Sequence, residues 1–269
     1  MDWDDAYENM KNIPGGSEFP PRWNALAEAY RAEIGDRRSR LAYGDGARQW
    51  ADLYLPDSTP KGLAVFVHGG YWMKLSPDSW SHLAKGALAH GWAVGMPCYT
   101  LCPEARISGI TQEICTAIQM LATEVDGPIR LAGHSAGGHL VTRQICTDSR
   151  LGDGHPELPG RVEHVLSISG VHDLRPLLQT GMNQTLGLDM TEARAESPCL
   201  LEPITGAQIT CWVGADERPE FVRQNALLAN VWSGFDVHFK AVEDPGLHHF
   251  NIIDALADPG SPMITKWLG

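Results

Sequence analysis

The chain has 269 residues, of which 43% are hydrophobic and 20% are charged. These values suit one α/β domain with a sizeable core and exclude a largely disordered chain. The formal net charge of −12 would repel a polyanion, so we exclude nucleic acid as a partner. Residues 2–5 are mostly acidic rather than basic, no signal-peptide pattern follows, and no apolar run reaches the length of a membrane span. We therefore expect a cytoplasmic protein without a membrane partner.

The first regular pattern is an amphipathic helix over residues 22–34, followed by an antiparallel hairpin over residues 41–55. Apolar strands then alternate with helices along the rest of the chain. The strands are predicted at 63–68, 92–98, up to 132, 164–168, 207–213 and 236–242. The helices are predicted at 79–90, 110–121, from 136 onward, and at 221–232.

Strands that alternate with helices indicate an α/β fold, with a mostly parallel sheet covered by helices on both faces. We expect one domain over residues 1–269, because no linker or internal repeat interrupts the pattern. Residues 171–203 are longer than a simple crossover needs. They predict a small cap over the carboxyl edge of the sheet, where ligands bind in this architecture.

Residues 131–138, Leu-Ala-Gly-His-Ser-Ala-Gly-Gly, contain the pattern G-x-S-x-G with Ser135 at its centre. The pattern lies between a predicted strand and a predicted helix, the context in which a sharp turn exposes a serine hydroxyl. The backbone N–H groups at the start of such a helix favour negative charge. A glycine-rich turn with an incidental serine is the alternative, but the strand and helix on either side favour a nucleophile.

Residues 68–72, His-Gly-Gly-Tyr-Trp, end an earlier buried strand, where an oxyanion loop is expected to lie. A plain Gly-Gly turn is the alternative interpretation. Glycine lets the backbone approach a substrate closely, so backbone N–H groups of this loop and of the following helix can bind an oxyanion. The predicted donors are Gly69, Gly70, Tyr71 and Ala136. His68 is expected to hold the loop in shape.

Two aromatic side chains near these motifs are predicted to line the substrate pocket, Trp72 beside the loop and His134 before the serine. His134 and His139 are five residues apart, which is not the spacing of helical metal ligands. No cysteine or histidine set has the spacing of a zinc site, so we expect no metal. The six cysteines are expected to be reduced thiols, with Cys98 and Cys102 nearer the surface than the others.

A serine hydroxyl is a weak nucleophile and needs a histidine base, which an acid orients. In the chain order serine, acid, histidine, the histidine follows the last strand, where His248 and His249 both stand. The acid follows the strand that ends near residue 214, where Asp216 and Glu217 both qualify. Spacing alone does not choose within either pair. The chemistry expected is acyl transfer to a small-molecule substrate, without a cofactor.

Taken together, these motifs resemble the kynurenine formamidase, or arylformamidase, branch of the α/β-hydrolases, which lies close to esterases and lipases with an HGG loop. The resemblance runs through most of the chain. It is carried by residues 21–23, 43–44, 52–56, 68–72, 99–103, 133–137, 169–174, 197–198, 219–224 and 249–250. The Tyr43-Gly44 hairpin and the Pro-Glu-Phe-x-Arg-Gln segment at 219–224 are the more particular features.

The resemblance implies an α/β-hydrolase fold, with Ser135 as the nucleophile and His249, directly before Phe250, as the base. It places the family's catalytic aspartate on Glu217, with Asp216 one position earlier, and this departure leaves the acid open between the two. The substrate it implies is N-formylkynurenine.

Two other functions remain compatible with the sequence. A short-chain carboxylesterase or thioesterase would use the same residues, so the substrate must be argued from the pocket. A non-catalytic binding protein of the same fold is less favoured, because both the serine and the histidine are present. The sequence does not indicate an oligomeric state.

Overall fold

The computed structural model describes residues 1–269 and has a single sheet of eight strands at its centre. The strand order is β1-β2-β4-β3-β5-β6-β7-β8, with β2 antiparallel to both of its neighbours and all other pairs parallel. The strands are β1 Arg38–Ala42, β2 Trp50–Tyr54, β3 Leu63–Val67, β4 Ala93–Pro97, β5 Ile129–His134, β6 Val162–Ile168, β7 Gln208–Gly214 and β8 His238–Asp244. The predicted fold class, a mostly parallel sheet with helices on both faces, is confirmed.

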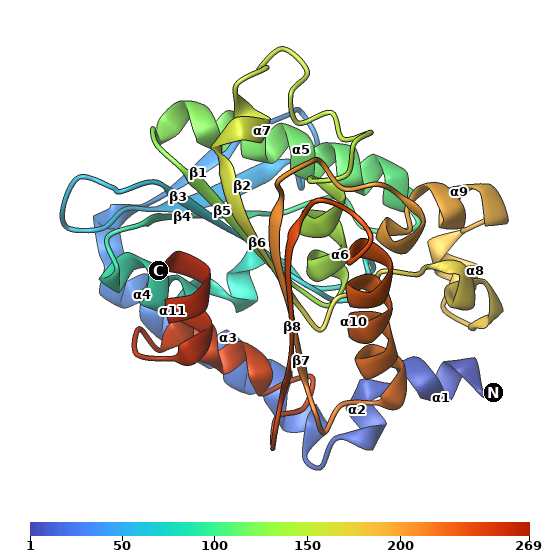
Figure 1. Cartoon of the computed structure of the whole chain (residues 1–269). Coiled ribbons are helices and arrows are strands. Elements are labelled where there is room, and N and C mark those ends of the chain that lie inside the picture. Colours follow the sequence, from blue (N-terminus) through green and yellow to red (C-terminus); the bar gives the residue numbers. More distant parts are fainter.

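Helices cover both faces of this sheet (Figure 1). Those on one face are α3 Phe19–Ile34, α4 Ala84–Ala89 and α11 Pro262–Leu268, and those on the other are α5 Ile107–Glu124, α6 Ala136–Arg143 and α10 Pro219–Trp232. The remaining α-helices are short: α1 Trp3–Tyr7, α2 Asn9–Asn12, α7 Leu158–Arg161, α8 Asn183–Leu186 and α9 Met190–Ala195. None of the helices is both long enough and apolar enough to span a lipid bilayer.

The central strands are apolar on both sides because both sides face helices. All five residues of β3 are buried. Leu63, Val65 and Val67 point into a core of 42 buried residues, whereas Ala64 and Phe66 point into a second core of 27 buried residues. Successive side chains of this continuous apolar run therefore point alternately into one core and the other.

Three details differ from the sequence-based expectation. The helix predicted at 79–90 is a regular α-helix only from Ala84, because residues 77–83 form two 3₁₀ turns. Cys98 and Cys102 are buried like the other four thiols, so their expected position near the surface is wrong. The helices α1, α2 and α11 were not predicted.

The parallel strands bring five separate loops to one edge of the sheet. Strands β3, β5, β6, β7 and β8 are successive neighbours and run in the same direction. Their carboxyl ends therefore place the loops that follow them side by side. Each predicted functional motif lies in, or directly after, one of these loops.

Candidate active site

Ser135 occupies a sharp turn between β5 and α6. Its backbone has φ 56° and ψ −117°, a region that non-glycine residues rarely adopt. A Cβ atom at Gly133 would lie 2.1 Å from the carbonyl oxygen of Gly137, and one at Gly137 would lie 2.0 Å from that of Val67. Only glycine fits at these two positions. The two glycines of the G-x-S-x-G pattern are therefore required for the sharp turn that carries Ser135.

The loop after β3 presents unpaired backbone donors beside this turn. The N–H groups of Gly69, Gly70 and Tyr71 have no hydrogen-bond partner in the structure. Gly70 and Tyr71 have φ angles of 109° and 54°, so the loop is wound in the left-handed region. Ala136 is the first residue of α6, and the first N–H groups of a helix lack intrahelical acceptors. All four predicted donors therefore lie close to Ser135 or in the loop next to it.

His68 lies buried beneath this loop. Its Nδ1 donates to the carbonyl oxygen of Gly69 at 2.7 Å, and its ring stacks on Tyr99 with centroids 4.3 Å apart. The Tyr99 hydroxyl also donates to the carbonyl oxygen of His68 at 3.0 Å. Burial lowers the pKa of His68 to about 3, which keeps the ring neutral. These contacts fix the shape of the loop.

Glu217 and His249 form a buried pair at the ends of β7 and β8. The His249 Nδ1 atom lies 2.6 Å from Glu217 Oε2, and the Glu217 side chain has no exposed surface. Glu217 Oε1 accepts two further hydrogen bonds, from the Ser169 hydroxyl at 2.5 Å and from the Gly214 N–H at 2.9 Å. A carboxylate oxygen accepts hydrogen bonds, so His249 carries its proton on Nδ1 and leaves Nε2 free to accept one.

The two residues beside this pair are placed differently. Asp216 is exposed, and its side chain makes no hydrogen bond. The His248 ring packs edge-on against Phe19, with centroids 5.3 Å apart. His248 Nδ1 accepts a hydrogen bond from the N–H of Phe250 at 3.2 Å, so the ring supports the turn. Of the two candidate acids and two candidate bases, the structure joins Glu217 to His249.

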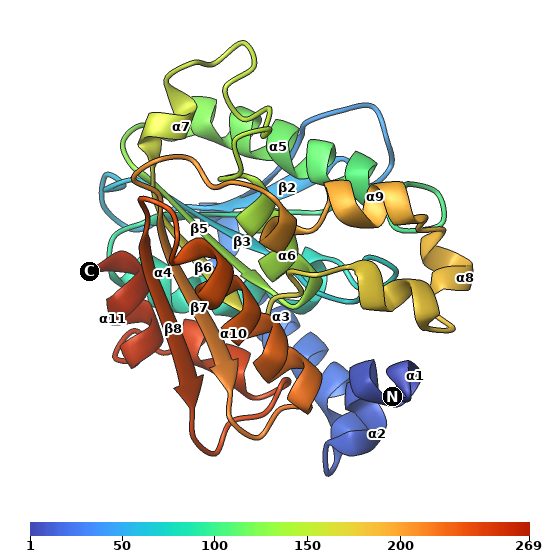
Figure 2. The same cartoon turned by 45° about the vertical axis from the view of Figure 1, so that its right-hand side comes forward.

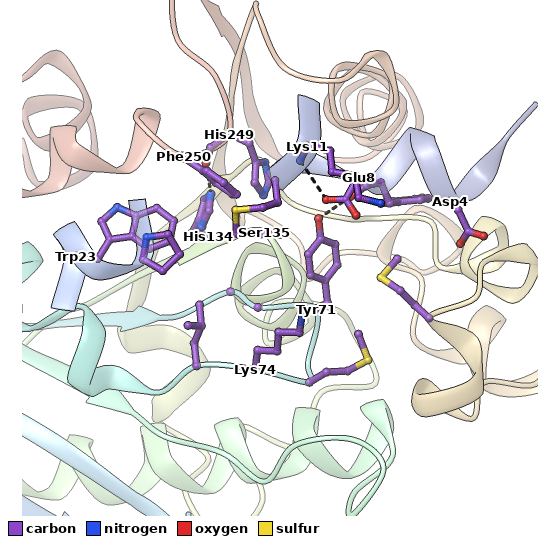
Figure 3. Close-up of a pocket in the computed structure, with 18 of the residues that line it drawn as sticks. Asp4, Glu8, Lys11, Trp23, Tyr71, Lys74, His134, Ser135, His249 and Phe250 are labelled. Carbon is purple, nitrogen blue, oxygen red and sulfur yellow. Dashed lines mark hydrogen bonds between the residues drawn. The ribbon is translucent and has the colours of Figure 1, made fainter. Parts of the chain in front are cut away.

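A cavity of about 740 Å³ opens over Ser135 and His249. Figure 3 shows both side chains on the same wall, next to His134 and Phe250. No hydrogen bond joins the Ser135 hydroxyl to the His249 ring in this structure. His134 lines the cavity as predicted, and its Nε2 donates to the carbonyl oxygen of His249 at 2.9 Å. Burial, and then the nearby His249 ring, lower the pKa of His134 well below its ordinary value.

Trp72 does not line this cavity, contrary to the sequence-based expectation. Its side chain is only 1% exposed and packs edge-on against His139. The ring belongs to the core of 42 buried residues, and the backbone at Trp72 has a positive φ of 56°. The aromatic part of the cavity wall comes instead from Tyr7, Trp23, Tyr71, Trp80 and Phe250.

A comparison with known protein families agrees with this geometry. Residues 64–249 match a family model described as alpha/beta hydrolase fold, a span that contains the elbow, the glycine loop and the Glu217–His249 pair. The chain belongs to the alpha/beta hydrolase fold family. A kynurenine formamidase from Danio rerio is 29% identical to this alpha/beta hydrolase over 286 aligned residues, covering 93% of this chain and 92% of that protein.

Solved structures agree with the assignment of this chain to the alpha/beta hydrolase fold family. A candidate thioesterase from Silicibacter sp. TM1040 is 48% identical, with a TM-score of 0.93 and complete coverage of both chains. An esterase from the archaeon Pyrobaculum calidifontis is 16% identical, covers 94% of this chain and 93% of its own, and has a TM-score of 0.71. At that identity, the second likeness supports the fold alone.

Part of the cavity of this alpha/beta hydrolase was missed by reasoning from sequence. The N-terminal helices α1 and α2 and the loop between them line it with Asp4, Tyr7, Glu8, Met10 and Lys11, and α1 packs against α10 (Figure 2). The predicted cap, 171–203, contributes only Gly181 and Met182. Ser169 was also missed, although it directly follows β6, between the strands that carry Ser135 and Glu217. Its position directly after a predicted strand at this edge could have identified it from the sequence.

No cluster of three or more His, Cys, Asp or Glu side chains is placed to hold a metal ion.

Proposed function

We propose that this alpha/beta hydrolase is a serine hydrolase in which Ser135, His249 and Glu217 act as a catalytic triad. The hydrogen bond between His249 Nδ1 and Glu217 Oε2, at the same cavity as the strained Ser135 turn, is the observation that carries this proposal. It fixes the tautomer in which Nε2 can take the proton of the serine. The hydrogen bond from Ser135 to a catalytic histidine commonly tightens only when substrate is bound.

The proposed reaction is hydrolysis of a formamide in two steps. Ser135 Oγ attacks the formyl carbon while His249 Nε2 takes its proton, and backbone N–H groups of Gly69, Gly70, Tyr71 and Ala136 bind the oxyanion. His249 then gives the proton to the departing amine nitrogen as the C–N bond breaks. His249 then takes a proton from water as the water oxygen attacks the formyl-serine ester, and it returns that proton to Ser135 Oγ as the C–Oγ bond breaks and formate is released. Apart from the water that is consumed, each step uses only groups that this chain supplies.

The proposed substrate is N-formylkynurenine, which makes the leaving group an aniline with an amino-acid side chain. The similarity to the kynurenine formamidase of Danio rerio, which extends over 93% of this chain, supports this choice. The five aromatic residues of the cavity wall provide flat apolar surface for an aryl ring. A volume of about 740 Å³ also lies within the range of small-molecule pockets, roughly 300–1,000 Å³.

The direct test is kcat/KM of the purified protein on N-formyl-L-kynurenine, measured beside 4-nitrophenyl acetate and a short acyl-CoA. We expect about 10⁴ M⁻¹s⁻¹ or more for the formamide, the low end of natural enzyme–substrate pairs. The ester and the thioester should be slower. A formamide value orders of magnitude lower, beside rapid turnover of another substrate, would reject the formamidase proposal and leave the triad proposal standing.

Thioester hydrolysis is the second candidate, because the 48% identical structure is described as a candidate thioesterase. The same triad and oxyanion donors would act on a thioester carbonyl, with a thiolate in place of the aniline as leaving group. The acyl-CoA arm of the same assay decides between the two substrates. A kcat/KM for acyl-CoA well above that for the formamide would favour this candidate.

Ser169 is proposed as a positioning residue for the triad acid, since its hydroxyl donates to Glu217 Oε1 at 2.5 Å. We expect Ser169→Ala to lower kcat at least about tenfold with little change in KM, because the loss of a hydrogen bond to a charged group costs about 1.5–3 kcal/mol. Ser167→Ala is the matched control, because Ser167 is a buried serine two residues earlier, within β6, and its hydroxyl lies 3.3 Å from His172 Nε2. Equal losses of activity in both variants would contradict a specific role for Ser169.

A further inference from the structure

The cavity over Ser135 carries unpaired charges of both signs on its wall. Lys11 and Lys74 line it, as do Asp4 and Glu8. Neither lysine forms a salt bridge in the structure, although the chain has a net charge of −12. Unpaired cations on the wall of a concave site attract anionic ligands more strongly than the same charges on a convex surface. The two lysines line the same cavity as two carboxylates, so the cavity offers partners to a cation and to an anion at once.

These charges come from two separate parts of the chain that face the same space. Lys74 lies in the loop after β3, five residues beyond Gly69, whereas Glu8 and Lys11 lie at and within α2. Figure 3 shows the Lys74 side chain extending toward Tyr71, with Glu8 and Lys11 together on the opposite wall. Glu8 also accepts a hydrogen bond from the N–H of Lys11 at 3.3 Å, which holds its carboxylate beside that residue.

Several hydrogen bonds hold the N-terminal wall, so the backbone that carries its charged residues is positioned before substrate binds. Asp4 accepts a hydrogen bond from the N–H of Gly181 at 2.7 Å, and the Tyr7 hydroxyl donates to Glu220 at 2.8 Å. The Tyr71 hydroxyl donates to the carbonyl oxygen of Tyr7 at 2.5 Å, joining this wall to the oxyanion loop. Groups that are already positioned lose less entropy when they bind a ligand.

We infer that this charged part of the cavity recognises an α-amino-acid head group on the leaving-group side of the substrate. Lys11 and Lys74 bind its carboxylate, and Glu8 binds its ammonium group. This inference rests on the proposed function, because N-formylkynurenine carries such a head group at the end opposite its formyl amide. A neutral short-chain ester would leave all three side chains without a partner. An acyl-CoA would give its phosphates to the lysines but would offer no cation to Glu8.

Three formamides with the same reacting bond separate these contributions. N-Formyl-L-kynurenine carries both charges, 4-(2-formamidophenyl)-4-oxobutanoate lacks the amine, and 2′-formamidoacetophenone lacks both groups. The measured quantity is the ratio of kcat/KM between substrates for each variant. A ratio cancels any general loss of active enzyme, so it reports recognition of the head group alone.

We expect Lys11→Gln and Lys74→Gln each to reduce the preference for the two carboxylate substrates over the acetophenone by about tenfold, mainly through KM. Glu8→Gln should reduce by a similar factor the preference for N-formyl-L-kynurenine over its deaminated analogue, and should leave the preference for that analogue over the acetophenone unchanged. Glutamine keeps an oxygen that can accept the Lys11 N–H, so α2 should remain folded. Lys85→Gln is the matched control, because Lys85 is an exposed lysine of α4 that does not line the cavity.

The inference is overturned if the ratios of the lysine and Glu8 variants equal those of the wild type, or if Lys85→Gln changes them as much. It is also overturned if all three formamides lose activity equally, because the side chains would then support only the fold. If the wild type hydrolyses none of the formamides, the proposed function fails by itself. The same variants are then compared on 3-(2-acetoxyphenyl)propanoate and 2-propylphenyl acetate. A retained, lysine-dependent preference for the anionic ester supports carboxylate recognition, and its absence rejects it.

Discussion

Replacing Ser135 with alanine is expected to lower kcat on N-formyl-L-kynurenine by roughly 10⁴-fold or more, which is the order of loss when a catalytic serine is removed. The change removes the atom that forms the acyl-enzyme and leaves the oxyanion donors and the cavity in place. Alanine must adopt the same φ of 56°, so the backbone strain of the turn is retained. We therefore expect a melting temperature within a few degrees of the wild type. Steady-state kinetics and thermal unfolding of the two proteins check both parts.

A fluorophosphonate probe supplies an independent measure of the same prediction. The wild type should form one covalent adduct, which peptide mass spectrometry places on Ser135, and Ser135→Ala should form none. Ser167→Ala, which removes a buried serine elsewhere in the core, should still be labelled. Substantial turnover by a clean preparation of Ser135→Ala, or labelling of a different serine, would show that another residue is the nucleophile.

The sheet and the elbow could be predicted from sequence because each has a local physical cause. A strand such as Leu63–Val67 must be apolar throughout when helices cover both of its faces, and this appears as an uninterrupted run. The turn at Ser135 needs glycine on both sides, because a Cβ atom at either position would collide with a backbone carbonyl. Both features are visible as short patterns in the sequence, even though the carbonyl that excludes a side chain at Gly137 belongs to the distant residue Val67.

The N-terminal part of the cavity could not be predicted because its structure depends on distant contacts. Helices α1 and α2 have five and four residues, too short to be stable alone. They are held by bonds such as that from the Tyr7 hydroxyl to Glu220, which lies 213 residues away. The pattern of apolar residues along a short helix does not predict such a contact. The orientation of Trp72 was missed for a similar reason, because proximity to a motif does not indicate which side of a strained loop a ring occupies.

The choice between Asp216 and Glu217 also required the structure. The two residues are adjacent in a loop, where no period of two or 3.6 residues assigns one side chain to the interior. In the structure, three groups donate hydrogen bonds to the carboxylate of Glu217, those of Ser169, Gly214 and His249. Two of these lie in other parts of the chain, at positions 169 and 249. The buried carboxylate is thus identified by its donors, not by its place in the sequence.

Glu217→Gln is expected to lower kcat by roughly 10³- to 10⁴-fold, as changing a triad acid to its amide does elsewhere. The Gly214 N–H can only donate, so the amide oxygen must occupy the Oε1 position. The amide NH₂ then faces His249 Nδ1, which must become an acceptor, and the proton moves to Nε2. The ring can no longer take the proton of Ser135. Asp216→Asn makes the matching change at an exposed neighbour and should keep kcat within about twofold. Steady-state kinetics of both variants test the assignment, and a Glu217→Gln enzyme that keeps more than a tenth of its kcat would reject it.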